Sequence, residues 1–406
     1  MRDDDVVVVM GVRTPFSPFG GAMRDMPSID LGAMVIAELL RRTGIKGEQI
    51  DEIFYGMTMQ AEAALYNNCC ARQALLKAGL PPETVSLTID RACCSSVACA
   101  ILSFRTIKAG EGEVFLAVGA ENMSHTPQVA PPEIRWGTRT GPIVFRDCIA
   151  PIGHTWLTEP EAKNAGETAL EYGIGREEQD RWAYQSQMRY QEAFKAGKYT
   201  VGEELMTVEV PQRKGAPVVV DRDLFPKPET TMESLAKLKT VYESPTVTAG
   251  NAPGLDTGAS GLMIMTRRKA KELGLAPLAT LIASASICTK PNLLAVNPGY
   301  AIKKLLGKAG MTIDDLNLIE INEAFAAVPL VSSKILADGD LAKTEKIREK
   351  LNVNGGAIAI GHPVGASGAR LIMTLMYELR RRGGGIGVAG ICGGISQGDS
   401  VLIKVE

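Results

Sequence analysis

The sequence repeats one stretch, first as Gly44-Ile45-Lys46-Gly47-Glu48-Gln49-Ile50-Asp51-Glu52-Ile53 and later as Gly310-Met311-Thr312-Ile313-Asp314-Asp315-Leu316-Asn317-Leu318-Ile319. Without a gap, both copies place a glycine, apolar positions, an acidic residue and a final isoleucine at the same spacing. A chance match over so few residues is the alternative explanation. The repeat predicts that the chain is built from two similar halves.

Each half continues with the same alternation of apolar runs and segments of helical spacing. In the first half, Val85–Ile89 and Val114–Val118 have the apolar runs of strands, and Cys93–Ala109 between them is typical of a helix. In the second half, Ala366–Arg382 predicts a helix and Ile386–Ala389 a strand. Alternating strands and helices indicate a layered α/β architecture in which helices cover a sheet.

The region between the halves has a different composition. Residues 124–246 contain all three tryptophans, several prolines and amphipathic helical patterns. Such a segment reads as an insertion that covers a site or forms contacts between subunits. We therefore expect a first half at residues 1–121 plus 248–275, an inserted loop domain at 122–247 and a second half at 276–406.

Composition argues against several classes of function. The chain has 406 residues and a formal net charge of −2. It therefore lacks the excess of basic residues that would indicate nucleic-acid binding. It lacks the uninterrupted apolar run of about 18 residues that a membrane span needs, and Asp3-Asp4-Asp5 is unlike a secretory or transit signal. Eight cysteines without regular spacing indicate free thiols in a reducing compartment, and three histidines argue against a metal site. We expect a cytoplasmic protein.

A cysteine occupies a turn of small residues where the first-half helix is expected to begin. The segment reads Ile89-Asp90-Arg91-Ala92-Cys93-Cys94-Ser95-Ser96. A helix that begins there directs free N–H groups and the positive end of its dipole at the sulfur of Cys93, which would lower the pKa of the thiol. The alternative is a buried, inert cysteine, and Cys94 and Cys99 fit that description.

Three further candidates lie in the second half. His362 and Cys392 occupy glycine-rich turns, and Asn322 precedes a predicted helix. Because Cys93 and His362 follow the two copies of the repeat at nearly the same distance, packing the halves together would bring them face to face. A nucleophilic thiol needs a basic partner, and carbon–carbon bond chemistry needs a second proton carrier. The alternatives are a structural histidine, a buried cysteine and a helix N-cap.

Taken together, these segments resemble the thiolase family. The resemblance implies an α/β thiolase fold, with two similar five-layered αβαβα halves and an inserted loop domain, assembled as a homodimer or as a homotetramer of two dimers. The matching pieces occur in family order over essentially the whole chain and are Asp90–Ser96, Gly119–Ser124, Thr248–Ala252, Asn322–Ala326, Asn354–Arg370 and Cys392–Gly394.

The resemblance also implies a role for each catalytic residue. Cys93 matches the nucleophile that becomes acylated, and His362 matches the base that activates it, with Asn322 holding a water nearby. Cys392 matches the acid and base that moves the α-proton of the acetyl unit. The backbone amides of Cys93 and Gly394 match an oxyanion hole.

The substrate pocket departs from the family pattern. Ala165 follows Asn164 where many thiolases have His-Met, and Leu294 stands where others have a pocket methionine. The small Ala165 suggests room for acyl chains longer than that of acetoacetyl-CoA. The residues expected to contact coenzyme A or the substrate are Lys227, Ser234, Gly250 and Asn251.

The implied activity is cleavage of a 3-oxoacyl-CoA by coenzyme A to acetyl-CoA and a shortened acyl-CoA, or the reverse Claisen condensation, through acyl-Cys93. This is acyltransferase activity of the kind used in fatty acid metabolism and β-oxidation, with coenzyme A as a substrate and no permanently bound cofactor or metal. A ketoacyl-synthase-like enzyme is one alternative, but it would normally lack Cys392. A thiolase-like protein that binds acyl or sterol ligands without catalysis would normally have lost part of the catalytic set.

Overall fold

The computed structural model describes residues 2–65, 68–150, 157 and 159–406. Within them, the main sheet has nine strands in two groups, which are joined where β1 pairs with β10. Across the sheet the strands are β11 (Leu318–Ile321), β12 (Gly385–Gly393), β13 (Gln397–Val405), β10 (Ala279–Cys288), β1 (Val6–Arg13), β9 (Thr257–Thr266), β4 (Val114–Asn122), β2 (Glu52–Gly56) and β3 (Val85–Ile89).

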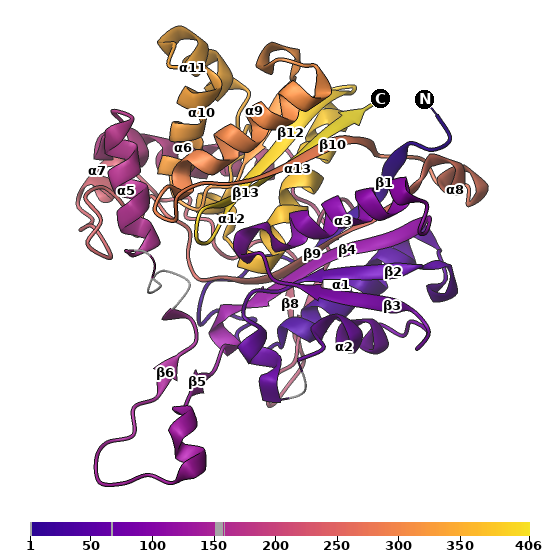
Figure 1. Ribbon diagram of the computed structural model, residues 1–406, viewed down its shortest axis with the longest axis horizontal. Coiled ribbons are helices and arrows are strands. Elements are labelled where there is room, and N and C mark those ends of the chain that lie inside the picture. The colour runs from indigo at the N-terminus through magenta and orange to yellow at the C-terminus, as the bar shows by residue number, and fades with distance from the viewer. Residues whose placement is uncertain (1, 66–67, 151–156, 158) are drawn as a thin grey trace.

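Helices lie on both faces of each strand group and produce a stack of five layers (Figure 1). The central layer consists of α3 (Ser95–Ala109) and α13 (Ser367–Arg381), which pack against each other. On the outer faces, α1 (Ser28–Thr43) and α2 (Cys70–Lys77) cover the first group, and α9 (Asn297–Ala309) covers the second. The other helices are α5 (Glu161–Glu171), α6 (Arg176–Lys195), α7 (Met232–Ala236), α8 (Arg267–Glu272), α10 (Ala327–Leu336), α11 (Leu341–Glu349) and α12 (Ala357–Ile360).

The apolar pattern explains why the central strands are buried on both faces. In β1, Val6 and Val8 face the core around α3 and α13, whereas Val7 and Val9 face the core beneath α1 and α2. Successive side chains of a strand point to opposite faces, so consecutive valines suit a strand with helices on both sides.

The two copies of the repeated stretch fold alike. α1 ends at Gly44, where φ is 70°, and a 3₁₀ turn at Gly47–Gln49 leads into β2. α9 ends at Gly310, where φ is 66°, and a 3₁₀ turn at Ile313–Asp315 leads into β11. Glycine is favoured at both helix ends because a left-handed backbone strains other residues. The repeated sequence therefore marks a repeated structure.

Two predicted helix starts were wrong. The first-half helix begins at Ser95 rather than Cys93, because Ala92–Cys94 form a 3₁₀ turn in which Ala92 has a φ of 49°. In the second half, α10 begins at Ala327, so Asn322 lies in the turn after β11 and does not cap a helix. Both candidate residues are thus presented by turns.

One helical stretch, Ala92–Ala109, is long and apolar enough to cross a membrane by length and composition alone. It comprises the Cys93 turn and α3, the central helix of the fold, and most of it is buried inside the protein. Its apolar character is explained by packing against both strand groups and α13.

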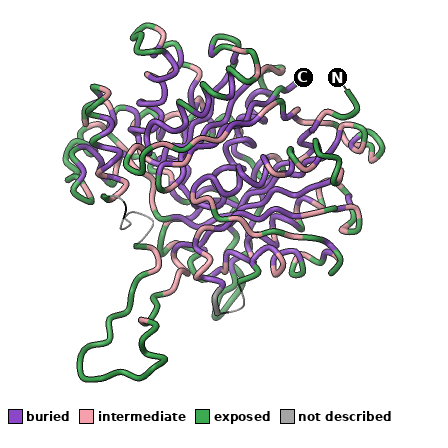
Figure 2. The backbone as a smooth tube through the Cα atoms, in the orientation of Figure 1, coloured by how far each residue is buried: buried purple, intermediate pink, exposed green. Residues whose placement is uncertain are grey.

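The inserted region has an extended arm and a compact part. The strands β5 (Gln128–Val129) and β6 (Arg146–Asp147) form a hairpin that stands away from the body (Figure 1) and is largely exposed (Figure 2). Farther along the chain, β7 (Val208–Val210) pairs with β8 (Val218–Val220), and α5 and α6 pack against α10. The boundaries that we assigned to the inserted domain stay a prediction.

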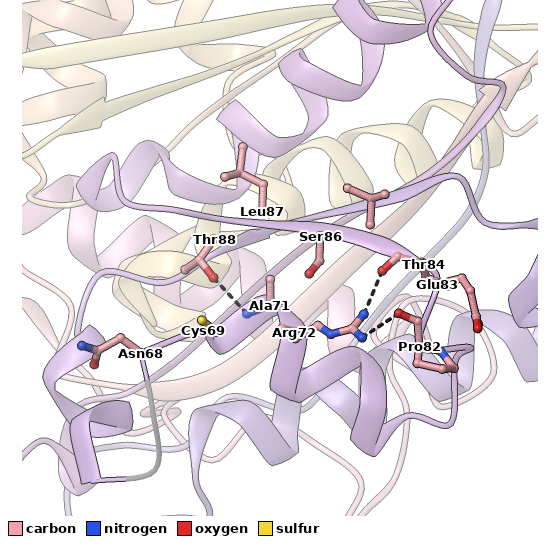
Figure 3. A pocket seen from close by; sticks show the side chains of 11 residues that line it. Asn68, Cys69, Ala71, Arg72, Pro82, Glu83, Thr84, Ser86, Leu87 and Thr88 are labelled. Atoms are coloured by element: carbon pink, nitrogen blue, oxygen red, sulfur yellow. Dashed lines mark hydrogen bonds between the residues drawn. The ribbon is translucent and has the colours of Figure 1, made fainter.

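One edge of the main sheet is open along β3. The side chains of Val85 and Leu87 are exposed there, and a hollow of about 570 Å³ runs between this strand and α2. Figure 3 shows Arg72 at the hollow, where its guanidinium donates to the backbone oxygens of Thr84 and Pro82. The residues that line this hollow do not include Cys93 or any other candidate catalytic residue, so it is a separate surface feature.

Candidate active site

Cys93 and His362 meet at the centre of the molecule, although they are far apart in the sequence. The Cys93 turn precedes α3, while His362 lies between α12 and α13. The sulfur of Cys93 is 3.2 Å from Nε2 of His362, and both residues are buried. Because α3 packs against α13, the turns that precede these helices are brought together. The predicted pair is therefore in contact.

The hydrogen bonds of Ser367 define the tautomer of His362. The hydroxyl of Ser367 donates to the backbone oxygen of Pro363 at 2.9 Å, and its Oγ lies 2.6 Å from Nδ1 of His362. Since the single hydroxyl proton is used by Pro363, Oγ accepts from Nδ1–H. Nε2 then presents a lone pair to Cys93. The ring is also held from its backbone, because the N–H of His362 donates to Oδ2 of Asp256 at 2.5 Å.

Burial determines the resting charge of the pair. It raises the pKa of the Cys93 thiol well above its ordinary value, and the nearby Cys392 and Glu161 raise it further. It lowers the pKa of His362 to about 3, with a smaller contribution from Arg370. The resting site therefore holds a thiol and a neutral imidazole. The expected lowering of the thiol pKa was wrong, because desolvation outweighs the N–H groups of a short turn.

Asn322 lies beside the same imidazole. Its Nδ2 is 3.4 Å from Nε2 of His362, and its Oδ1 accepts from Arg370 at 3.4 Å. Arg370 is fully buried on α13, with Nη1 3.5 Å from a carboxylate oxygen of Glu320. The guanidinium therefore orients the amide so that its N–H₂ group faces the histidine, where it can donate to a bound oxygen.

Cys392 reaches the site from the end of β12. It is fully buried, and both burial and the charge of Glu161 raise the pKa of its thiol. The following glycines pack directly on the Cys93 turn. A Cβ atom added to Gly393 would lie 3.0 Å from the sulfur of Cys94, and one added to Gly394 would lie 3.2 Å from the Cβ of Ala92. These glycines let the two turns approach closely, which places Cys392 and the Gly394 amide beside Cys93.

Two predicted pocket residues share an apolar cluster with the second thiol. Ala165 on α5 and Leu294 at the start of a 3₁₀ turn (Leu294–Val296) are buried in the same apolar cluster as Cys392. α5 packs against that 3₁₀ turn. The pair therefore belongs to the apolar core that also contains Cys392, and its role in acyl binding stays a prediction.

The predicted coenzyme A residues separate into two kinds. Lys227 and Ser234 are exposed, and the charge of Lys227 acts on the buried Asp256, which holds the His362 backbone. Asn251 is fully buried, and its amide donates to Asp180 and to the backbone of Thr246. Because both amide hydrogens of Asn251 are used inside the protein, its side chain supports the turn. A contact between this turn and substrate would come from its backbone.

Gly250, the neighbour of Asn251, is explained by packing. A Cβ atom added there would lie 2.5 Å from a methyl group of Leu235 and 2.6 Å from one of Leu238. The glycine lets the turn of residues 248–252 approach α7, the helix that carries Ser234. The structure thus brings the two parts of the predicted coenzyme A region together, and their contact with the ligand stays a prediction.

Four residues of the site were not predicted from the sequence. Only one of them lies in a local sequence pattern that could have indicated its role. Ser367 lies in a small-residue run five positions after His362, where a hydroxyl within reach of the ring could have been considered. The roles of Asp256, Arg370 and Glu161 depend on contacts between distant segments, which no local pattern indicates.

The geometry of the site is enough to assign the protein to a class of enzyme. A thiol that touches a neutral imidazole can form a covalent acyl intermediate, and a second thiol beside it supplies a proton carrier. The geometry is that of a cysteine-dependent acyltransferase.

Comparison with known proteins gives the family. The model of the thiolase N-terminal domain matches residues 6–268, and the model of the thiolase C-terminal domain matches residues 275–405. The chain belongs to the thiolase family. It is 41% identical to an acetyl-CoA acetyltransferase of Chromobacterium violaceum, with 99% of each chain covered.

Solved structures of similar fold support the same family. The acetyl-CoA acetyltransferase of Bacillus anthracis matches with a TM-score of 0.92 and 34% identity, over 99% of both chains. Human mitochondrial 3-ketoacyl-CoA thiolase in complex with CoA matches with a TM-score of 0.90 and 35% identity, over 99% of this chain and 98% of that one. The predicted thiolase fold is confirmed, but its five layers are formed by the two halves together around α3 and α13 and not by each half alone.

Proposed function

We propose that this protein is a thiolase that cleaves a 3-oxoacyl-CoA with coenzyme A, or condenses two acyl-CoA molecules in the reverse direction. The observation that carries the proposal is the 3.2 Å contact between Cys93 and His362, with the thiol of Cys392 buried beside the same turn. Membership of the thiolase family supports acyl transfer to and from coenzyme A.

In the first half-reaction, the sulfur of Cys93 attacks the 3-keto carbon while its proton passes to Nε2 of His362. Because burial disfavours both charged forms, proton transfer accompanies the attack and does not precede it. The N–H groups of His362 and Asn322 then face the new oxyanion. When the carbon–carbon bond breaks, the acyl group stays on Cys93, and the acetyl-CoA carbanion takes the proton of Cys392.

The second half-reaction restores every proton. The thiol of coenzyme A gives its proton to the Cys392 thiolate, and the resulting thiolate attacks the acyl group on Cys93. As Cys93 leaves, its sulfur takes back the proton held by His362. Both cysteines and the histidine return to their starting states, and one covalent intermediate links two substrates, which is a ping-pong scheme.

The two alternatives that we considered from the sequence are less well supported. A condensing enzyme of the ketoacyl-synthase kind does not account for the second buried thiol of Cys392. A binding protein without catalysis does not account for the contact between Cys93 and the lone pair of His362. Thiolase activity accounts for both.

The acyl pocket is the basis for a proposal about substrates. Ala165 is small and fully buried, and it belongs to the same apolar cluster as Leu294 and Cys392. We expect 3-oxoacyl chains longer than four carbons to be accepted, because each additional buried methylene contributes about 0.8 kcal/mol.

Rates with 3-oxoacyl-CoAs of increasing length, together with acetyl-CoA alone in the condensing direction, test both the activity and the chain length. Thiolysis of these substrates supports the proposed function, and absence of turnover with every one of them overturns it. A rate that falls sharply for substrates longer than acetoacetyl-CoA would show that the acyl pocket cannot hold longer chains.

The exposed surfaces support an oligomer. The open edge of β3, with Val85 at 58% and Leu87 at 47% exposure, offers unpaired backbone groups and apolar side chains to a second copy. The projecting arm also exposes large apolar residues, including Trp136 at 87% exposure. We infer a homodimer formed through β3, with the arm available to join two dimers into a homotetramer.

The thiols support the proposed compartment. All eight cysteines are free, and the proposed chemistry requires Cys93 and Cys392 to stay reduced. We therefore place the protein in the cytoplasm, with fatty acid metabolism or β-oxidation as its setting and acyl-CoA molecules as its ligands.

A further inference from the structure

Glu161 lies against the turn that follows Cys392. It is the first residue of α5, within the inserted region. A Cβ atom added to Gly394 would lie 3.3 Å from Oε1 of Glu161 and 3.2 Å from the Cβ of Ala92. One glycine therefore separates the carboxyl group from the Cys93 turn. The inserted region thus contributes an acidic group to a site otherwise built from the two halves.

The turn beside Glu161 has a strained backbone. Ile395 and Ser396 have φ values of 56° and 54°, in the left-handed region that non-glycine residues rarely adopt. The carboxyl of Glu161 accepts the backbone N–H of Ile395. The hydroxyl of Ser396 donates to the backbone oxygen of Pro291 on the other side of the turn. Glu161 is therefore one of the contacts that hold the strained turn and, with it, the Gly394 amide.

Among the residues that the structure describes, none forms an ion pair with the carboxyl of Glu161. Desolvation raises the pKa of this carboxyl to about 7. Its charge raises the pKa of both Cys392 and Cys93. A half-buried carboxyl that titrates near neutral pH beside two thiols, with no ion-pair partner among the described residues, is typical of a functional residue.

The other charged groups near α5 are directed elsewhere. On α5 itself, Lys163 pairs with Glu159 and lies near Glu243, and Glu167 is exposed. From α10, Lys334 donates to the backbone oxygen of Tyr172, beyond the opposite end of α5. The 3₁₀ turn at Leu294–Val296 carries no titratable side chain. Within the described part of the chain, the thiols of Cys392 and Cys93 are therefore the titratable groups that face the carboxyl.

We propose that Glu161 is a positioning residue for Cys392, which holds the turn after this cysteine and, when charged, opposes formation of its thiolate. During cleavage the S–H bond of Cys392 breaks as the acetyl α-carbon is protonated, and a negative charge on Glu161 disfavours the resulting thiolate. The neutral acid keeps the turn in place without this penalty. The inference rests on the proposed function, because it assumes that Cys392 carries the α-proton.

The ionisation of the Glu161 carboxyl determines how the rate of the carbon–carbon bond step changes with pH. Below neutral pH Glu161 is protonated, and as the pH rises through about 7 it becomes charged and slows the carbon–carbon bond step. In E161Q the amide oxygen can still accept the Ile395 N–H, but no charge forms. The ratio of the E161Q rate to the wild-type rate should therefore increase with pH. Taking this ratio cancels the ionisation of coenzyme A itself.

The experiment measures acetoacetyl-CoA cleavage by wild type and E161Q from about pH 6 to about pH 8.5. We expect the ratio to rise about tenfold across this range, which corresponds to one unit of thiol pKa. Glu161→Met has a neutral side chain of similar length and should show the same trend. It replaces E161Q in the measurement if E161Q does not fold. A ratio that stays flat or falls with pH overturns the proposal.

Two controls distinguish a failure of the proposed function from a failure of the role proposed for Glu161. E167Q removes a charge from an exposed position of the same helix, and its ratio to wild type should stay constant with pH. Acetylation of Cys93 by acetyl-CoA, measured by peptide mass, is recorded for each variant. If wild-type Cys93 is never acetylated, the proposed function fails. If it is acetylated and the E161Q ratio is flat, only the role of Glu161 fails.

Discussion

At the scale of single residues, the chemistry depends on which nitrogen of His362 carries the proton. Ser367 fixes this, because its hydroxyl donates to Pro363 and leaves its oxygen to accept from Nδ1. Without that acceptor, the ring could place its proton on Nε2, where it would face the Cys93 thiol instead of accepting from it. A residue that touches neither substrate nor sulfur therefore controls whether the base is available.

Ser367→Ala should lower kcat by about 10–100-fold while KM stays close to that of wild type, as for other residues that orient a reactive imidazole. Steady-state kinetics measures both constants. Ser103→Ala is a matched control, because Ser103 is also a buried serine whose hydroxyl bonds a backbone oxygen, but it lies on α3 away from the site. An unchanged kcat in Ser367→Ala would show that the tautomer is set by another group.

Residue-scale electrostatics were the part least accessible from the sequence. The small-residue turn indicated Cys93, which the structure places in contact with His362. The direction of its pKa shift depends on desolvation, which follows from the complete fold. The same holds for Glu161, whose raised pKa results from burial against a distant turn. A local pattern shows which side chain is reactive, whereas its charge state is a property of its surroundings.

At the scale of secondary-structure elements, the His362 loop is held against β4. A Cβ atom added to Gly119 on β4 would lie 2.1 Å from the backbone oxygen of Gly365, which leaves no room for a side chain. Glu121, two residues farther along the strand, accepts the backbone N–H of Gly365 at 2.9 Å. The strand therefore sets the position of the loop that carries His362.

Gly119→Ala should force this loop away from β4, with a cost of about 1–3 kcal/mol in the free energy of unfolding and a fall in kcat. Chemical denaturation and steady-state kinetics measure the two effects. Gly307→Ala is the control, because Gly307 is exposed on α9 with no atom near the added Cβ. It should stabilise the protein by about 0.5–1 kcal/mol. Equal effects of the two substitutions would contradict the close approach that we describe.

At the scale of the whole molecule, the repeat was the most useful signal in the sequence. It indicated two similar halves, and the placement of Cys93 and His362 after the two copies indicated that they would meet. The starts of α3 and α10 could not be predicted in the same way. The turns before them carry the reactive groups, and tertiary contacts between the halves override local helix propensity there.

The same arrangement explains why neither half is sufficient alone. The first half supplies Cys93, the thiol that we propose becomes acylated, and the second supplies His362 and Cys392. We infer that the two thiols have different chemical roles. Acylation of Cys93 by acetyl-CoA is thioester exchange and produces no carbanion, whereas making or breaking the carbon–carbon bond requires proton movement at the α-carbon.

The most direct test compares Cys392→Ala with Cys93→Ala for acetyl-enzyme formation and for exchange of the acetyl-CoA α-protons in heavy water. Cys392→Ala should still form acetyl-enzyme but lose α-proton exchange and condensation by about 10²–10⁴-fold, the usual contribution of a general acid–base. Cys93→Ala should form no acetyl-enzyme. Near-normal exchange and condensation in Cys392→Ala would contradict the account, because Cys392 would then be a structural residue.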